Sequence, residues 1–520
     1  MYRISQIKLA LDEPKELLPK KIKKKLGNNI DIKDYKIVKE SIDARDKSDI
    51  RLVYTVDFDV EQRKGEKPAL KPNPKKNLSI APDMSYKAAV PGVCELKHRP
   101  VIVGFGPCGI FCALILAQQG YRPIVLERGK CVSERAEDVQ RFWNGGDLNT
   151  ESNVQFGEGG AGTFSDGKLT TGIKDTRIYK VLSEFVSAGA PEEILYKNKP
   201  HIGTDLLRDV VANLREEIIR LGGEIRFSSK LIGIEAPSGE IKAAEVQDVL
   251  SGKSYVLETE KLVLAIGHSA RDTFRYAQEL GIEMSAKPFS IGVRIEHPQE
   301  MVDEAQYGKT KGLPPAEYKL SYRCKNGRGV YTFCMCPGGE VIMSSSQEGG
   351  VVTNGMSNHS RDSGTANSGL LVDVRVSDFD GDDALAGVEF QEKYERLAYK
   401  NGGGRYAFPK TCWADFRDGD EGAKAVIDSL PDFAVESIRE AMPHLGRKLK
   451  GFDADNAVMK AVETRSSSPV RFFRDDKLQG SIKGIYPAGE GAGYAGGITS
   501  AACDGIKVAE RIIEEFYFKG

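Results

Sequence analysis

Three glycines in the first quarter of the chain are spaced for holding a phosphate group. Gly104, Gly106 and Gly109 form a GxGxxG pattern in VIVGFGPCG, directly after a short apolar run. In such a turn the first glycine allows the tight bend, the second lets the backbone approach a pyrophosphate, and the third lets the next helix pack on the strand. That helix adds unpaired N–H groups and the positive end of its dipole. The pattern predicts a dinucleotide site here, to which Pro107 and Cys108 also belong.

An acidic residue follows at the distance that a ribose contact requires. Glu127 comes eighteen positions after Gly109, at the end of the apolar run PIVL, and Arg128 follows it. Its carboxylate is placed to accept hydrogen bonds from a ribose diol. Strand, glycine turn, apolar helix, second strand and acid in this order indicate an adenine dinucleotide. The alternative is a glycine-rich turn in an unrelated α/β unit, and the turn alone does not separate FAD from NAD.

The other end of the chain makes FAD the better candidate. In GIYPAGEGAGYAGGITSAACDG a short strand ends at Gly489 and Glu490, a glycine loop follows, and a helix is predicted to start near Ile498. This arrangement predicts an acidic group beside a ribityl or phosphate group. It also places a helix N-terminus, with Gly496 and Gly497, near the flavin pyrimidine, where the dipole stabilises negative charge on reduced flavin. A plain amphipathic helix with a flexible lead-in is the alternative.

Several long motifs are similar to a known family. The segments SNVQFGEGGAGTFSDGKLTTG, CMCPGGEVI, VETRSSSPVR and YPAGEGAGYAGGITSAA resemble a bacterial family of uncharacterised FAD-dependent, dehydrogenase-like proteins. That family belongs to the glutathione-reductase and hydroxybenzoate-hydroxylase flavoprotein superfamily. The resemblance covers nearly the whole chain and implies FAD and a three-part architecture, without an established substrate. Cys108, where alanine is usual, and FPKTCWADF, where an APAQ-type stretch is typical, depart from the pattern.

The resemblance also implies further cofactor contacts. Gly157, Gly159 and Gly162 repeat the GxGxxG spelling, but polar residues precede them and no helix follows, so we expect an irregular loop against the flavin ring. A structural loop away from the flavin is the alternative. By analogy with the superfamily, the contacts of this loop are Arg135, Gln155, Gly160, Ala161, Gly162, Thr163 and Lys168. The strand KLVLAIG and a preceding strand add Leu231, Ala265, Ile266 and Gly267.

The elements that position these residues predict an α/β protein of several domains. At 520 residues the chain exceeds the size of one hydrophobic core. We expect a small N-terminal α+β, ferredoxin-like domain over residues 1–60 and a proline-rich linker over 61–91. A Rossmann-like FAD-binding domain, a three-layer ββα sandwich, is predicted to be discontinuous over 92–285 and 451–520. Residues 286–450 are predicted to form an inserted α+β substrate or cap domain.

Other candidate groups leave alternatives open. Cys334 and Cys336 form a CxC pair that could be redox-active, although the spacing is poor for a disulfide and buried thiols are favoured. Arg465 and Arg471 could hold an anionic substrate or the flavin edge, and a structural role is as well supported. The scattered histidines predict no metal site.

These features favour an FAD-dependent oxidoreductase that transfers hydride through the flavin N5, with an unknown small-molecule substrate and no assigned catalytic acid or base. No second framed nucleotide turn is present, so a dedicated NAD(P)H domain is not expected, and NAD(P)H stays a candidate only as a transient electron donor. The alternative is an RNA-associated flavoprotein that docks nucleic acid through the lysines of residues 20–25, but no aromatic signature accompanies them. Unpaired cysteines and the lack of a long apolar run predict a cytoplasmic protein without a membrane segment.

Overall fold

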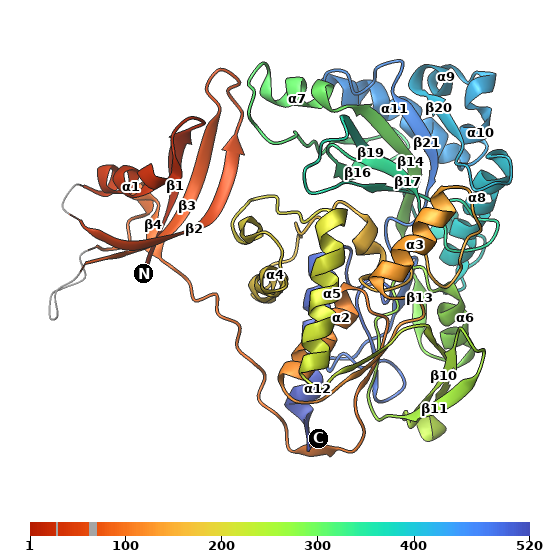
Figure 1. Ribbon diagram of the computed structural model, residues 1–520. Coiled ribbons are helices and arrows are strands. Elements are labelled where there is room, and N and C mark those ends of the chain that lie inside the picture. The colour runs from red at the N-terminus through yellow and green to blue at the C-terminus, as the bar shows by residue number, and fades with distance from the viewer. Residues whose placement is uncertain (28–29, 62–69, 520) are drawn as a thin grey trace.

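The structure is a computed structural model that describes residues 1–27, 30–61 and 70–519. Figure 1 shows a small N-terminal sheet at one side, a parallel-sheet body below and a cap above that body. Within the described ranges, no helix combines the length and the apolar character that a membrane span needs.

A five-stranded parallel sheet forms the centre of the body, in the order β23-β12-β6-β7-β8. Most of its strand residues are apolar and buried, as expected of a parallel sheet covered on both faces. The strands are β6 (Val101–Val103), β7 (Ile124–Leu126), β8 (Glu224–Arg226), β12 (Leu262–Leu264) and β23 (Ile485–Pro487).

Two cores lie on opposite faces of this sheet. Ile102, Val125 and Val263 pack with the helices α2 (Pro107–Gln118), α5 (Thr204–Arg220) and α12 (Ile498–Glu515). The residues next to these three in the same strands point to the other face. There they pack against the antiparallel sheet of β9 (Ser229–Glu235), β10 (Ala243–Asp248) and β11 (Ser254–Glu258). The three layers confirm the predicted Rossmann-like ββα sandwich. Its other helices are α3 (Val132–Trp143), α4 (Arg177–Ser187) and α6 (Arg271–Glu279).

The first and last helices of this body cross at van der Waals distance. A Cβ on Gly505 of α12 would lie 2.1 Å from the carbonyl oxygen of Cys108 in α2. Only glycine fits at such an approach of two backbones. The crossing joins the N-terminal and C-terminal parts of the discontinuous body.

The cap is built on a six-stranded antiparallel sheet in the order β15-β16-β19-β14-β21-β20. Its last long strand, β21, lies beyond residue 450, where the cap was predicted to end. The strands are β14 (Phe289–Pro298), β15 (Ser321–Arg323), β16 (Gly329–Cys336), β19 (Thr365–Val374), β20 (Lys410–Cys412) and β21 (Val458–Glu463). The helices are α7 (Gln299–Tyr307), α8 (Ala386–Asn401), α9 (Trp413–Asp418), α10 (Lys424–Ile427) and α11 (Asp432–Lys448).

Three two-stranded sheets complete the body and the cap. They pair β13 (Met284–Ala286) with β22 (Val470–Phe472), β17 (Glu340–Met343) with β18 (Thr353–Met356), and β5 (Cys94–Leu96) with β24 (Phe516–Phe518).

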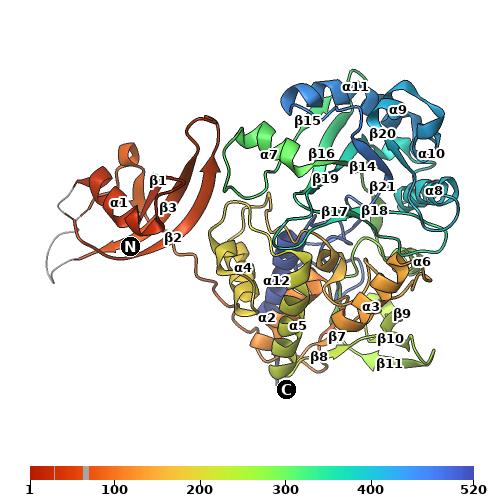
Figure 2. The ribbon, with the colours of Figure 1, turned by 45° about the horizontal axis from the view of Figure 1, so that its top comes forward.

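The N-terminal domain has the strand order β2-β3-β1-β4, all antiparallel, which is the order of a ferredoxin-like sheet. One helix, α1 (Leu18–Leu26), packs on the sheet of β1 (Tyr2–Ala10), β2 (Ile32–Asp43), β3 (Arg51–Val60) and β4 (Leu78–Ile80). Strand β4 lies in the segment predicted as linker, and part of that linker, residues 62–69, lies outside the described residues. Figure 2 shows this domain beside α4 and α7.

Three of the lysines considered for RNA docking bond within their own domain. Lys21 lies 2.7 Å from Glu13 and Lys23 lies 2.9 Å from Asp31. The Nζ of Lys25 donates to the carbonyl of Ser5 at 2.9 Å. These contacts do not add support for a nucleic-acid surface on α1.

A buried histidine in the cap core predicts acid sensitivity. His297 is 3% exposed between Phe452 and Tyr318, and burial lowers the pKa of its imidazole from 6.5 to about 4. The unfolded chain binds the proton more readily than the folded protein does. The contribution of neutral His297 to the free energy of unfolding is therefore fully present above pH 6.5 and is lost as pH falls towards 4. We expect the free energy of unfolding to drop by about 3 kcal/mol over that window from this group. Urea unfolding at several pH values across the window should show that the free energy of unfolding of His297→Phe depends less on pH. An equal pH dependence in this variant and in the unsubstituted protein would contradict this assignment.

Candidate functional site

A deep cavity opens where the strands of the parallel sheet end, between the body and the cap. Ligands bind at this edge in open α/β sheets. Its walls include nineteen of the predicted residues: Gly104, Gly106, Pro107, Cys108, Glu127, Arg128, Gln155, Gly160, Ala161, Gly162, Lys168, Leu231, Ala265, Ile266, Gly267, Glu490, Gly496, Gly497 and Ile498. The structure therefore brings segments from both ends of the chain to one site.

The glycine turn is packed so closely that two of its glycines admit no side chain. Gly104 has φ +99°, and a Cβ there would lie 2.4 Å from the carbonyl oxygen of Ala265. A Cβ on Gly109 would lie 1.9 Å from the carbonyl oxygen of Gly104. Gly109 does not line the cavity; it lets α2 start directly behind the turn, as its position in the motif predicts.

The middle glycine faces open space. Gly106 is the N-cap of α2 with φ −82°, and a Cβ there would meet Gly160 no closer than 3.6 Å. Gly160, from the opposite loop, lines the same slot. Two glycine backbones thus face each other at the N-terminus of a helix, and this cradle fits the pyrophosphate of a dinucleotide.

Glu127 has a second role that its spacing does not reveal. Its carboxylate accepts backbone N–H bonds from Phe105 at 2.8 Å, Gly129 at 2.9 Å and Gly157 at 3.0 Å. The side chain is 5% exposed and so ties the glycine turn to the following loop. A carboxylate has about four acceptor positions, which leaves one for a ribose hydroxyl. The predicted ribose contact remains compatible with this geometry.

Arg128 is held beside Glu127 by two acidic side chains. It donates to Glu151 at 2.5 Å and to both oxygens of Asp272 at 2.9 Å, and it lies over the ring of Phe156. These hydrogen bonds outweigh desolvation and raise the pKa of its guanidinium. Arg128 therefore presents a fixed planar cation to the cavity beside Glu127.

Two residues predicted as direct contacts lie behind the cavity wall. Arg135 is fully buried and donates to the carbonyls of Asn153, Glu158, Val154 and Gly160, at 2.6–2.9 Å. Burial lowers the pKa of its guanidinium to about 10. Thr163 is 1% exposed and donates to the carbonyl of Glu158. Both side chains shape the loop from behind, because its carbonyls point away from the cavity and need donors.

The loop itself is irregular, as its sequence context predicts. Gly157, Gly159 and Gly160 have φ values of +120°, +82° and +60°, and the loop continues as a 3-10 turn, Gly160–Phe164. Further along, Lys168 reaches the cavity, where its Nζ donates to the carbonyl of Met335 and lies 3.8 Å from Glu317.

The glycine loop that begins at Gly489 is held by a side chain of α12, the helix that follows it. The amide of Gly489 donates to Asp504 of α12 at 2.7 Å, and Asp504 also pairs with Arg474 at 2.8 Å. Gly489 does not line the cavity, and it packs so closely on α2 that a Cβ there would be 2.8 Å from the Cβ of Cys108. Glu490 does line it, 3.1 Å from Nδ1 of His268. The Nε2 of His268 is buried and has no hydrogen-bond partner, so this cavity residue retains a free polar position.

The cap supplies the wall opposite the loop. Glu463 at the end of β21 is bonded through both oxygens to Arg294, which also donates to the carbonyl of Cys334 at 3.0 Å. Desolvation raises the pKa of the Glu463 carboxyl, and the Arg294 guanidinium acts in the opposite direction. The pair places a buried carboxyl group on the cavity surface.

Both cysteines of the CxC pair line this wall as free thiols. A β-bulge between Phe333 and Cys336 turns Cys334 into the left-handed region, with φ +41°, and exposes its side chain to the open cavity. The surrounding protein nevertheless desolvates the Cys334 thiol and raises its pKa to about 12. Burial also raises the pKa of Cys336. Thiols of this kind are poor nucleophiles, which favours the structural interpretation of the pair.

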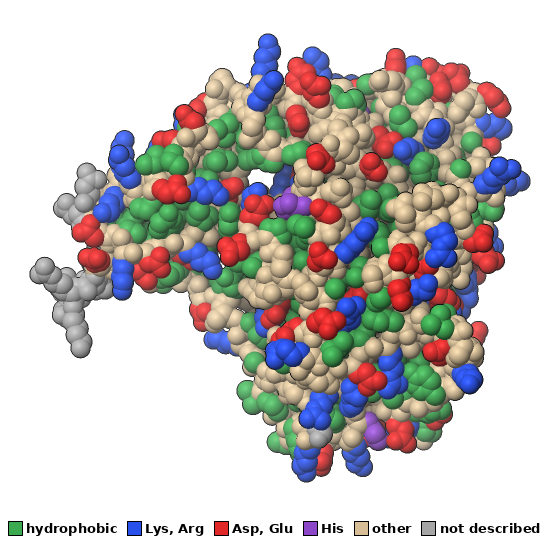
Figure 3. All heavy atoms as spheres, in the orientation of Figure 1, with side chains coloured by type: hydrophobic (Ala, Val, Ile, Leu, Met, Phe, Trp, Pro, Cys, Tyr) green, Lys and Arg blue, Asp and Glu red, His purple; other side chains and the backbone are tan. Residues whose placement is uncertain are grey.

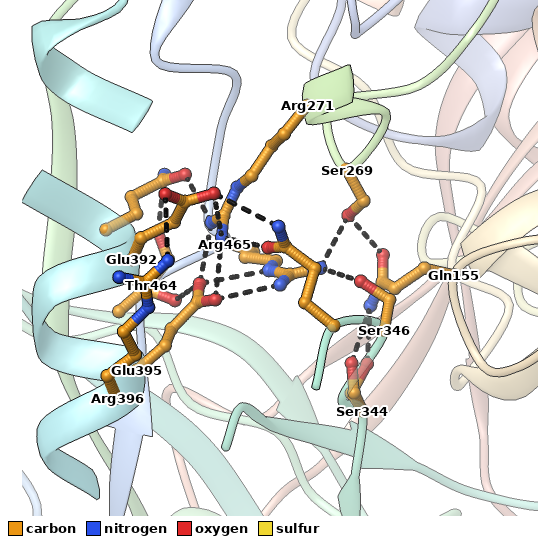
Figure 4. A network of polar contacts seen from close by, with 12 residues as sticks. Gln155, Ser269, Arg271, Ser344, Ser346, Glu392, Glu395, Arg396, Thr464 and Arg465 are labelled. Carbon is orange, nitrogen blue, oxygen red and sulfur yellow. Dashed lines mark hydrogen bonds and ion pairs between the residues drawn. The ribbon is translucent and has the colours of Figure 1, made fainter. Parts of the chain in front are cut away.

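Arg465 belongs to a buried network rather than standing free for a substrate (Figure 4). Glu395 of α8 bonds both Arg465 and Arg271, with its closest contacts at 2.8 and 2.7 Å. Arg465 also donates to Ser269 at 3.0 Å, and Ser269 donates to Gln155 at 3.0 Å. This network joins the cap helix to the loop that carries Gln155. Coulombic attraction to two guanidinium groups outweighs desolvation and lowers the pKa of Glu395.

Several cavity residues are absent from the sequence-based prediction. They come mainly from the cap, whose strands carry no nucleotide-binding pattern. The motifs CMCPGG and ETRSSS indicated part of this wall. The position of His268, directly after the strand that ends in AIG, was a signal that could have identified it. The added residues include His268, Ser269, Thr273, Phe333, Ser344, Thr353, Asn354, Glu463 and Ser466, whereas Cys334, Cys336 and Arg465 were already candidates.

Comparisons with known proteins agree with a flavin site. A family model described as "FAD-dependent protein, C-terminal domain-like" matches residues 288–466, and a domain of unknown function matches residues 1–59. An uncharacterised protein of Clostridium beijerinckii is 49% identical over 99% of each chain.

Solved structures with partial similarity include two enzymes. Glycerol-3-phosphate dehydrogenase from Bacillus halodurans complexed with FAD is 13% identical with a TM-score of 0.36, and the match covers 80% of this chain and 63% of that one. A flavin-dependent brominase is 13% identical with a TM-score of 0.39, over 79% of this chain and 77% of that one.

The residues present fit FAD. The slot between Gly106 and Gly160, the remaining acceptor position of Glu127 and the unpartnered Nε2 of His268 line one continuous cavity. The identity over the full length places both proteins in one family, and the family model names its cofactor. The chain belongs to the same family as the Clostridium beijerinckii protein, a family of FAD-dependent proteins.

Proposed function

We propose that the protein is an oxidoreductase that acts on a small molecule enclosed between the FAD-binding body and the cap. The observation that carries this proposal is the continuity of the cavity from the glycine turn at Gly106 to the cap wall at Glu463. Hydride transfer through the flavin N5 is the chemistry that FAD supplies when bound. A cavity that extends past the cofactor cradle into a second domain supports a substrate space beyond it.

The residues of the chain have distinct tasks in this proposal. The helix N-terminus at Gly497 and Ile498 lines the cavity and is oriented to stabilise negative charge at the pyrimidine end of the flavin. The wall around Phe333 and Glu463 covers the cavity from the cap side, and in this proposal it shields the reacting atoms from water. Lys168 brings a cation to the same space.

We also propose that a reduced nicotinamide delivers electrons at this cavity without a nucleotide domain of its own. In the described ranges the sole sheet of Rossmann type is the five-stranded parallel one, and the cap sheet is antiparallel. A donor that binds only transiently above the flavin is consistent with that arrangement.

The test is anaerobic reduction of the purified protein. The protein is expected to be yellow, with flavin absorbance near roughly 450 nm that disappears on adding NADH, NADPH or a donor from a substrate panel. A colourless protein that cannot be reconstituted with FAD would contradict the cofactor assignment. Bound FAD that no donor reduces would contradict the oxidoreductase proposal and favour a flavin-holding regulator.

A further inference from the structure

The N-terminal domain contacts the body through the free edge of its sheet. The amide of Glu40 in β2 donates to the carbonyl of Tyr196 at 2.7 Å, and the amide of Asn198 donates back to the carbonyl of Glu40 at 2.8 Å. The two bonds form a parallel bridge between β2 and the segment after α4. The side chain of Glu40 pairs with Lys15 at 2.7 Å, and Lys15 lies over the ring of Tyr196. The sheet edge therefore holds the segment that starts at Tyr196.

Two further lysines connect the N-terminal domain to α4 of the body and to α7 of the cap. Lys36 donates to the hydroxyl of Tyr179 on α4 at 2.8 Å. Lys47 donates to the carbonyl of Ala305 on α7 of the cap at 2.7 Å. Figure 3 shows the surface closing on either side of an opening between the domain and the rest of the molecule. The domain is thus attached at separate points to the FAD-binding body and to the cap.

The far half of the same segment is bonded to the loop that lines the flavin cavity. The amide of Leu169 donates to the carbonyl of Pro200 at 2.9 Å, and the amide of Ile202 donates to the carbonyl of Gly167 at 3.1 Å. Lys168 and His201 form an antiparallel bridge between these bonds. Residues 196–203 therefore run from the edge of β2 to the 165–169 loop.

This loop has direct links to the cofactor pocket. Its members Ser165, Asp166, Gly167 and Lys168 line the cavity. The hydroxyl of Thr499, in the first turn of α12, donates to the carbonyl of Leu169 at 2.8 Å. The loop and the flavin-facing end of α12 are therefore held together, and any shift of the loop reaches both.

We propose that the N-terminal domain supports the flavin pocket: the edge of β2 holds residues 196–203, and these residues hold the 165–169 loop in its cofactor-binding position. The inference assigns a task to a domain whose matching family model carries no function. It depends on FAD binding and not on the reaction proposed above, so the two can fail separately.

Glu40→Pro tests the bridge with little effect on the sheet. Both backbone groups of Glu40 point to residues 196–198, so its pairing with Tyr54 of β3 is not hydrogen-bonded. Proline is tolerated at such an edge position because it removes only the outward N–H. The loss of one backbone hydrogen bond predicts a rise of about five-fold in the FAD dissociation constant. Glu40→Ala keeps both backbone bonds, loses the side-chain contacts with Lys15 and the Tyr54 hydroxyl, and is expected to stay within about two-fold.

A second variant removes the same bridge from the other side. Asn198→Pro deletes the donor to Glu40 without altering the N-terminal domain, and Asn198 is exposed. Both proline variants should weaken FAD binding and increase hydrogen exchange at the amides of Leu169 and Ile202. Unchanged FAD affinity in both would overturn the proposal, as would an equal loss in Glu40→Ala. If Glu40→Pro also lowers hydrogen-exchange protection in β1 and β3, its own sheet is disturbed. The FAD affinity of Asn198→Pro then decides whether the proposal holds.

Discussion

Gly106→Val is expected to give a folded protein that purifies without colour. The valine side chain would project into the slot between Gly106 and Gly160, where the pyrophosphate is expected to lie. The backbone at Gly106 has φ −82° and the nearest atom to a Cβ is 3.6 Å away, so the substitution causes little strain in the fold. We expect FAD affinity to fall by about 100-fold or more, while the thermal unfolding midpoint measured without added FAD stays near that of the apoprotein.

Two further glycine variants show whether the effect is specific. Gly172→Val is the matched control, because a Cβ there meets nothing within 4 Å and the protein should remain yellow. Gly109→Ala should instead fail to fold normally, because its Cβ would lie 1.9 Å from a carbonyl oxygen. Normal FAD content in Gly106→Val would show that the pyrophosphate lies elsewhere.

Glu395→Ala is expected to produce the largest loss of stability among single ion-pair variants. Glu395 bonds two guanidinium groups, of Arg271 and Arg465, that are 1% and 9% exposed. Removing the shared carboxylate leaves two buried cations without their principal partner, which costs about 3–5 kcal/mol for a broken buried pair. Urea unfolding should show this decrease in the free energy of unfolding.

The control lies on the next position of the same helix. Arg396 is paired with Glu392 at 3.7 Å but its side chain is 71% exposed, so Arg396→Ala should change stability by less than about 1 kcal/mol. Because the network reaches Gln155 through Arg465 and Ser269, Glu395→Ala should also loosen the loop at the flavin cavity. A loss of stability no larger than that of Arg396→Ala would show that other donors and acceptors replace the carboxylate.

Local patterns could predict the part of the cavity around the glycine turn, because its residues lie close together in the sequence within one β-α-β unit. Gly104 and Gly109 are required by backbone contacts within one turn, and Glu127 follows at a fixed distance along the same β-α-β unit. The fold class follows from the same short apolar strands. The prediction included Arg135 and Thr163 among the cofactor contacts, whereas neither lines the cavity. A residue that touches the cofactor and a residue that supports the loop from behind have the same spacing in the sequence.

The substrate half could not be predicted in this way. Cys334 lies in β16, whereas Glu463 and Arg465 lie at and just after the end of β21. Only the pairing of strands in the order β16-β19-β14-β21 places them on one wall. The role of Glu40 depends on a contact with residues more than 150 positions away. Tertiary pairing determines these positions, and no local spacing encodes it.

The crossing of α2 and α12 has a consequence for the order of events during synthesis. Residues 104–109 leave the ribosome before the cap is made, whereas α12, which packs against α2, begins only at Ile498, after the whole of the cap. Strand β23 and the loop that carries Glu490 emerge just before it. A nascent chain therefore holds its phosphate turn without the opposite side of the pocket throughout the synthesis of the cap. Stable acquisition of the cofactor is expected to wait until β23 and α12 have been made, so a chain interrupted before Ile485 should be released as an apoprotein.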